Sequence, residues 1–111
     1  MKLEIAKYID STYLKTSDEL AISKKENKQN VLNVIFQAIE MSVACIMIRP
    51  EYVVLACKTI LEHKASVVVG TVVDFPFGNS STKEKISEAL ISINNGASDI
   101  DFVCDYNSFK R

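Results

Sequence analysis

Alternating carboxylates near the end of the chain are the residues best suited to acid–base chemistry in this sequence. Asp99 and Asp101 alternate with Ile100 and Phe102 in the segment 99–104. Successive side chains of a strand point to opposite faces, so both carboxylates are predicted on the face opposite the apolar set, which should face helices. A carboxylate on an interior face needs a cationic or hydrogen-bonding partner. Asp101 is therefore either a functional acid–base group or a strand-end residue that caps a nearby loop.

Other polar groups follow two earlier apolar segments. Asp10 precedes the hydroxyls of Ser11 and Thr12, and like Asp101 it is either a functional group or a strand-end residue that caps a loop. Asp74 is interpreted as a turn residue. The loop 78–82 leads into a helix start, where free N–H groups favour an anion. It lacks the spacing of a nucleotide-binding P-loop, and turn formation alone also explains its glycine and asparagine.

The composition predicts one ordinary globular domain over residues 1–111. Hydrophobic residues make up 48% of the chain and charged residues 24%, with a net charge of −1. A broad nucleic-acid or anionic-membrane surface needs clustered positive charge, so neither partner is expected. No apolar stretch reaches the ~18 residues that cross a bilayer, and the charged N-terminus has no signal-peptide core. We therefore expect a cytoplasmic protein.

The cysteines and the histidine are predicted to have structural roles. Cys45, Cys57 and Cys104 lie in apolar segments without CxxC spacing. This pattern is typical of reduced thiols packed in a core, rather than of a disulfide frame or a zinc site, so no metal is expected. The lone His63 lies near the end of a predicted helix, where a cation favours the helix dipole, and capping is preferred to catalysis.

Apolar segments that suit strands alternate along the chain with segments that suit helices. Ser23 and Ser81 each precede a glutamate by three residues, which is a capping-box pattern. Pro50 suits the first turn of another helix. The expected strands are 8–10, 43–48, 67–73 and 99–104. The expected helices run from Ser23 to about Met41, from Pro50 to about His63, and from Ser81 to Asn95-Gly96; residues 13–22 are expected to form a loop with one helical turn.

Each expected helix carries an apolar stripe at i, i+3, i+4 spacing, which predicts the face that packs on the sheet. Strands joined by helices are parallel and have right-handed crossovers. An open doubly wound sheet and a slice of a (β/α)8 barrel are both consistent with this order. The predicted buried stripes are Val31, Val34, Ile35, Ala38 and Ile39; Val53, Ala56, Cys57, Ile60 and Leu61; and Ile86, Ala89, Leu90 and Ile93.

Several segments together resemble one enzyme family. IDSTYLK at 9–15, VVDFPFGN at 72–79 and GASDIDFV at 96–103 resemble motifs of deoxyribose-phosphate aldolase, in the order of that family, and 48–53 fits more loosely. The resemblance spans nearly the whole chain. It implies the α/β class with a (β/α)8 TIM-barrel fold, of which this chain covers about strands one to four as a half-barrel. It also implies a class I aldolase that uses neither metal nor cofactor.

The resemblance assigns expected roles to four residues. Members of the family reversibly join acetaldehyde to glyceraldehyde 3-phosphate, giving 2-deoxyribose 5-phosphate through a lysine Schiff base, so a phosphorylated sugar or aldehyde is the implied partner. Asp101 falls on the family's catalytic aspartate, and Asp10 and Thr12 fall on residues near the substrate pocket. Met47 stands where the family usually has a cysteine, and this larger side chain, which cannot ionise, is expected to change the pocket's shape.

The family's Schiff-base lysine belongs to later strands, and none of the lysines at positions 7, 15, 58 and 85 matches it. The chain is therefore expected to represent an N-terminal half that is inactive alone. Because a half-barrel leaves open sheet edges and an uncovered apolar face, self-association is expected. Two alternatives remain open: a non-catalytic half-barrel that serves in binding or assembly, and another Schiff-base aldolase of related barrel fold.

Overall fold

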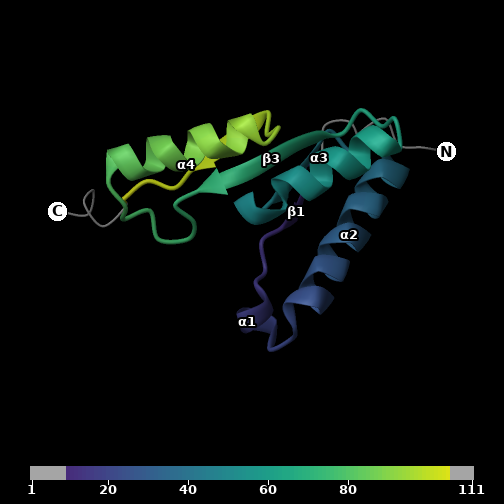
Figure 1. Ribbon diagram of the computed structural model, residues 1–111, viewed down its shortest axis with the longest axis horizontal. Helices are drawn as coiled ribbons and strands as arrows, with labels where there is room; N and C mark the ends of the chain where they lie inside the picture. Colours follow the sequence, from purple (N-terminus) through teal and green to yellow (C-terminus); the bar gives the residue numbers. More distant parts are fainter. Residues whose placement is uncertain (1–9, 106–111) are drawn as a thin grey trace.

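The computed structural model describes residues 10–105, which form one parallel sheet with helices between its strands (Figure 1). The strands are β1 (Asp10–Tyr13), β2 (Cys45–Ile48), β3 (Val68–Val73) and β4 (Asp99–Phe102). They lie in the order β1-β2-β3-β4 across the sheet, and every neighbouring pair is parallel. The predicted alternation of parallel strands and helices is therefore confirmed.

The first strand differs from the prediction. The sequence placed a strand at 8–10 and a loop from Ser11, but Ser11 and Thr12 belong to β1 and pair with Ile46 and Met47 of β2. Tyr8 and Ile9 fall outside the described residues. The prediction was wrong because pairing with a neighbouring strand decides where a strand ends, and a short polar segment carries little sign of that pairing.

The helices begin at the capping residues that the sequence indicated. The Ser23 hydroxyl accepts a hydrogen bond from the Glu26 N–H, and Ser81 with Glu84 forms a complete capping box. Pro50 opens a tight 3₁₀ turn that leads directly into the next helix. Within residues 10–105, no helix is both long and apolar enough to cross a bilayer. The helical elements are α1 (Ser17–Leu20), α2 (Lys24–Met41), η2 (Pro50–Tyr52), α3 (Val53–Glu62) and α4 (Thr82–Asn94).

The long helices pack on one face of the sheet. A right-handed crossover between strands that are neighbours in both chain and sheet returns each helix to the same side. A doubly wound sheet instead reverses its strand order so that helices cover both faces. The sequential order therefore identifies a slice of a (β/α)8 barrel. The main core lies between α2, α3 and the sheet and includes Val31, Ile35, Ile46, Ile48, Val53, Ala56, Ile60 and Val69.

Part of the predicted core is exposed. Leu61, in the last turn of α3, is 77% exposed, and the buried residues of α4 are Ala89 and Ser92. The apolar stripe of α4 is wider than the sheet surface that can cover it. Within residues 10–105, β4 is the edge strand and pairs with β3 alone. Cys104, predicted as a core thiol, is also exposed, whereas Cys45 is buried. The other apolar residues left more than half exposed here include Ile86, Leu90, Ile93 and Phe102.

Candidate active site

The sheet face opposite the helices carries the four residues that the sequence analysis selected. The register places Thr12 of β1 beside Met47 of β2, and Asp101 of β4 beside Val72 of β3. Asp10 lies two residues before Thr12 and therefore points to the same face. The ladder thus brings side chains from all four strands to one surface, although they are far apart in the sequence.

The alternation predicted for β4 is present in the structure. Ile100 packs against the core on the helix side, whereas the flanking Asp99 and Asp101 are exposed on the other face. Phe102 shares the helix side with Ile100, but it is 54% exposed rather than buried. The carboxylates are therefore accessible to a small molecule that approaches the face opposite the helices.

Met47 occupies the middle of this face and is only 6% exposed. It forms a small apolar cluster with Cys45 and Val72, against which Leu14 packs. A Cβ atom built at Gly70, the β3 partner of Met47, would collide with the Met47 sulfur and would lie 3.1 Å from the Cys45 Sγ. The absence of a side chain at Gly70 is therefore what accommodates the long methionine.

The Cys45 thiol is protected from ionisation. Its Sγ lies 3.8 Å from the Met47 Sδ. Burial, followed by the charges of Asp10 and Asp99, a hydrogen bond with Asp99 and the charge of Asp101, raises the pKa of Cys45 to about 12. Each of these causes disfavours the thiolate. The geometry therefore makes Cys45 a packing residue rather than a nucleophile at neutral pH.

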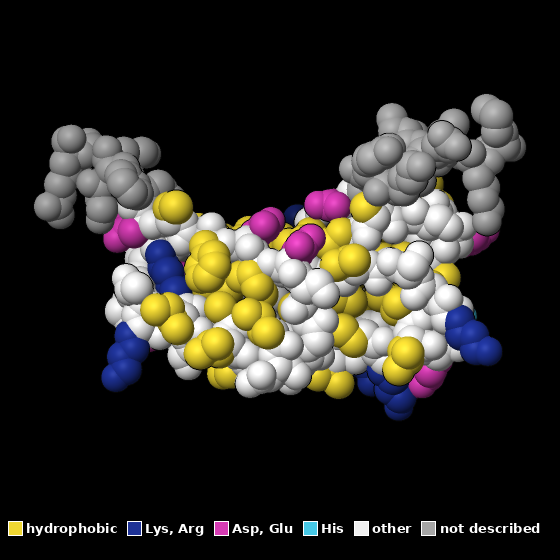
Figure 2. Space-filling view, turned by 90° about the horizontal axis from the view of Figure 1, so that it is seen from above, with side chains coloured by type: hydrophobic (Ala, Val, Ile, Leu, Met, Phe, Trp, Pro, Cys, Tyr) yellow, Lys and Arg dark blue, Asp and Glu magenta, His cyan; other side chains and the backbone are white. Residues whose placement is uncertain are grey.

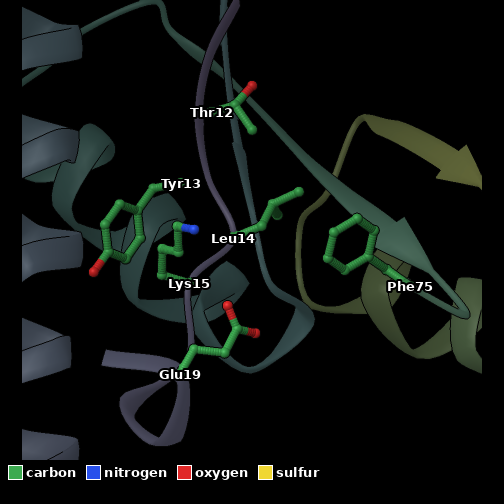
Figure 3. A pocket seen from close by; sticks show the side chains of 6 residues that line it. All are labelled: Thr12, Tyr13, Leu14, Lys15, Glu19 and Phe75. Atoms are coloured by element: carbon green, nitrogen blue, oxygen red, sulfur yellow. The ribbon is translucent and has the colours of Figure 1, made fainter. Parts of the chain in front are cut away.

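A pocket of about 410 Å³ opens beyond the C-terminal end of β1. Figure 3 shows Leu14 and Phe75 on facing sides of this pocket, while Tyr13 points away toward α2 and Glu19 rises from α1. Among the predicted site residues, Thr12 is the one that lines it. Its remaining walls come from Tyr13, Leu14, Lys15, Glu19 and Phe75.

The loop between β3 and α4 is held by its own polar groups. Asp74 has a left-handed backbone, with φ of 60°, and its carboxylate accepts hydrogen bonds from the Ser80 N–H at 2.7 Å and the Ser80 hydroxyl at 2.8 Å. Burial opposes ionisation, but these two bonds and the nearby Lys85 ammonium together hold the pKa of Asp74 below its usual value. The turn interpretation of Asp74 is therefore confirmed.

The contacts at the start of α4 favour a turn over an anion site in the segment 78–82. The Gly78 N–H bonds to the Asp74 carbonyl at 2.8 Å, and the Ser80 N–H is used by the Asp74 carboxylate. A side chain at Gly78, whose φ is 72°, would collide with Cys104 and Val103 of the segment after β4. The glycine is thus explained by the turn and by this close approach.

Sequence reasoning missed a buried hydrogen-bond centre beneath the β1–α1 connection. The Asn27 side chain is 2% exposed and accepts from the Tyr13 hydroxyl at 2.8 Å. Its Nδ2 donates to the Lys15 carbonyl at 3.2 Å and to the Tyr52 hydroxyl at 3.3 Å. Asn27 stands four residues before Val31, so its place on the buried stripe was the available signal.

His63 has the capping role that the sequence analysis preferred. Its Nδ1 lies 2.8 Å from the Thr59 carbonyl, and its ring meets the Phe36 ring edge-on at 5.4 Å between centroids. Within residues 10–105, no three His, Cys, Asp or Glu side chains converge in a way that suits a metal ion.

The sequence is similar to curated aldolases. No model of a known protein family matches it. It is 40% identical over 102 residues to a deoxyribose-phosphate aldolase of Caldicellulosiruptor saccharolyticus, covering 92% of this chain and 42% of the relative. It is 32% identical over 108 residues to one of Thermococcus gammatolerans, covering 97% of this chain and 44% of the relative. The chain thus spans less than half the length of these relatives.

Solved structures give the same result. An aldolase structure matches with a TM-score of 0.77 and 28% identity, covering 97% of this chain and 43% of the other. The structure of a tetrameric deoxyribose phosphate aldolase from Aeropyrum pernix matches with a TM-score of 0.72 and 25% identity, covering 94% and 40%. The fold is that of half a TIM barrel. In both sequence and structure the chain matches the N-terminal half of deoxyribose-phosphate aldolases.

Proposed function

We propose that this chain supplies one side of the active site of a class I aldolase. The proposed reaction is the reversible cleavage of 2-deoxyribose 5-phosphate to acetaldehyde and glyceraldehyde 3-phosphate. The observation that carries the proposal is the placement of Asp101 with Thr12 and Met47 on one face of the sheet, in a chain whose relatives are named deoxyribose-phosphate aldolase. Catalytic groups of such barrels come from several strands, and the groups proposed here come from β1, β2 and β4.

The proposed reaction needs neither a metal nor a cofactor. A lysine amine adds to the C1 carbonyl of the substrate and loses water, which gives a protonated imine. The C3 hydroxyl gives up its proton as the C2–C3 bond breaks, and the bond's electron pair moves into the imine to form an enamine. Protonation at C2 and hydrolysis then release acetaldehyde and restore the amine, while C3 to C5 leave as glyceraldehyde 3-phosphate.

In this proposal Asp101 moves protons around the carbinolamine that precedes the imine. Its exposed carboxylate is available for this role, and proton transfer by a positioned carboxylate is a common source of rate enhancement. Asp10 and Thr12 provide polar groups on the first strand. Met47 fills space between them and β3, and it narrows the site compared with a shorter side chain.

The attacking amine is proposed to come from a part of the barrel beyond these strands. Lys85 is unsuited to the role, because its Nζ donates to the Gly78 and Val103 carbonyls at 2.9 Å each and lies 3.8 Å from the Asp74 carboxylate. We therefore expect the 111-residue chain, treated with acetaldehyde and borohydride, to show no stoichiometric adduct by mass spectrometry. A full adduct at one lysine would contradict this assignment.

A hybrid enzyme tests the proposed reaction directly. Residues 1–105 of this chain would replace the matching part of the Caldicellulosiruptor relative, and cleavage of 2-deoxyribose 5-phosphate would be followed by the aldehyde released. The unaltered relative is the positive control. We expect measurable cleavage. A folded hybrid that neither cleaves 2-deoxyribose 5-phosphate nor forms it from acetaldehyde and glyceraldehyde 3-phosphate would reject the proposal.

The exposed apolar surfaces favour association, either with a complementary half-barrel or with a second copy. Figure 2, which views the molecule from the top of Figure 1, shows hydrophobic side chains over much of this side, with acidic side chains among them. The Aeropyrum relative is described as tetrameric. We also propose a cytoplasmic location, which is supported by three free cysteines, at positions 45, 57 and 104.

A further inference from the structure

Arg49 directly follows β2, and its side chain turns toward the connection between β1 and α1. Its Nε donates a hydrogen bond of 2.7 Å to the Leu14 carbonyl. One terminal nitrogen lies 3.4 Å from the Glu19 carboxylate of α1. The Arg49 side chain is only 15% exposed, compared with 49% for Glu19. The guanidinium is therefore largely enclosed by the first connection.

The same guanidinium reaches the connection between β3 and α4. Its central carbon lies 5.4 Å from the centroid of the Phe75 ring, in a cation–π arrangement. Leu14, Glu19 and Phe75 are three of the residues that line the 410 Å³ pocket. Arg49 thus contacts Leu14 and Phe75, which lie on facing sides of that pocket in Figure 3.

Each connection also has an anchor of its own. The β1–α1 connection is held by Asn27, which donates to the Lys15 carbonyl. The β3–α4 connection is held by Asp74 and Ser80. Removing Arg49 should leave both loops folded, while the fixed spacing between them is lost. A partly exposed ion pair such as Arg49–Glu19 adds little stability by itself, so its main effect is geometric.

We propose that Arg49 is a positioning residue that fixes the β1–α1 and β3–α4 connections relative to each other and thereby sets the width of the pocket between Leu14 and Phe75. The planar guanidinium suits this role because it donates in its plane and stacks with its face at once. A lysine ammonium at this position carries the charge but cannot make both contacts in this geometry. The structural role of Arg49 does not depend on the proposed reaction, whereas the expected effect of Arg49 on kinetics rests on that reaction.

The structural test uses the 111-residue chain and amide chemical shifts from NMR. Phe75→Leu is expected to shift the amides of residues 14–19 when Arg49 is present, and to leave them unchanged in an Arg49→Met background. Lys58→Met, which removes an exposed charge from α3, is the matched control. If the effect of Phe75→Leu on residues 14–19 persists without Arg49, or is absent with it, the proposal is wrong.

The kinetic test uses the hybrid enzyme described above. We expect Arg49→Met to raise KM for 2-deoxyribose 5-phosphate by about 10-fold, with a smaller change in kcat, because a misplaced wall weakens binding. Arg49→Lys should recover little of this loss, and Lys58→Met should behave as the unaltered hybrid. Full recovery with lysine would show that charge alone matters and would overturn the proposal. An inactive unaltered hybrid would reject the proposed reaction, while the NMR experiment would still decide the role of Arg49.

Discussion

Asp99 and Asp101 are two carboxylates on one short strand, and they differ in the residues that surround them. Asp99 contacts the buried Cys45 thiol and lies beside Gly70. Asp101 lies beside Val72, two residues closer to the C-terminal end of β4. Chemistry in parallel barrels belongs to the C-terminal end of the strands. The position along the strand therefore favours Asp101 as the acid–base group.

Asp101→Asn in the hybrid enzyme is expected to lower kcat by about 10²-fold, the usual scale for the loss of an acid–base group. The amide keeps the shape of the side chain but cannot carry the proton. Asp99→Asn is the matched control and should have a smaller effect. Steady-state kinetics of both variants, with circular dichroism to show that they fold, provides the measurement. Equal losses in the two variants would make Asp101 a structural carboxylate.

The Cys45 thiol is expected to resist alkylation at pH 8, whereas the exposed Cys104 reacts readily. The pKa of Cys45 near 12 keeps it protonated, and only the thiolate is a strong nucleophile. Asp99→Asn removes one of the causes that raise this pKa, so it should speed alkylation of Cys45. Peptide mass spectrometry after timed labelling separates the thiols. Fast labelling of Cys45 in the folded, unaltered chain would contradict the assignment.

The same pKa has a consequence for stability at alkaline pH. The folded chain holds the Cys45 proton up to about pH 12, whereas an unfolded thiol releases it near its ordinary value of 9.0. Between these values the unfolded state binds fewer protons, so this thiol makes the free energy of unfolding fall as pH rises. Its contribution is fully present below about pH 9. Cys45→Ala should flatten that part of the stability curve.

At the scale of elements, the capping box of α4 gives the sharpest test. Ser81→Ala removes the bond from the Glu84 N–H to the Ser81 hydroxyl, which is 3.1 Å long, and should lower the free energy of unfolding by about 1 kcal/mol. Ser87→Ala, at an exposed position inside α4, makes the same chemical change without a cap and should be neutral or slightly stabilising. Urea unfolding at a fixed protein concentration compares them. A larger loss from Ser87→Ala would contradict the capping account.

The order and type of the elements could be predicted from the sequence because caps and apolar runs are local signals. Ser23, Pro50 and Ser81 each mark a helix start that the structure contains. The ends of β1 could not be predicted, since Ser11 and Thr12 become strand residues through pairing with β2. The exposure of Leu90 could not be predicted either. The apolar stripe of a helix gives the face that packs, but not the area of sheet that is available to cover that face.

Part of the site was visible in the sequence and part was not. The alternation around Asp101 indicated its face, and the family motifs indicated Asp10, Thr12 and Met47. The register that gathers them is a property of the sheet, so no spacing in the sequence reveals it. Arg49 was missed because a single arginine before a proline belongs to no periodic pattern, and its partners lie in distant loops.

At the scale of the whole molecule, the sheet formed by residues 10–105 has two edge strands, β1 and β4. Ile86, Leu90 and Phe102 are each more than half exposed near one of these edge strands. We expect the purified chain to associate at micromolar concentration, because apolar surfaces of this kind usually form interfaces. Light scattering measures the mass, and a charged substitution, Leu90→Lys, should weaken association. A compact monomer that binds no hydrophobic dye would contradict this expectation.

The sequential order of the strands also bears on how the chain is made. Within residues 10–105, β1, β2 and β3 each pair with the next strand in the sequence, so these pairs can form in the order in which the strands are synthesised. A nascent chain leaving the ribosome can therefore add one β/α unit at a time to an existing edge, and domains synthesised first tend to fold first. Seen this way, the sheet grows in the direction of translation, from β1 to β4.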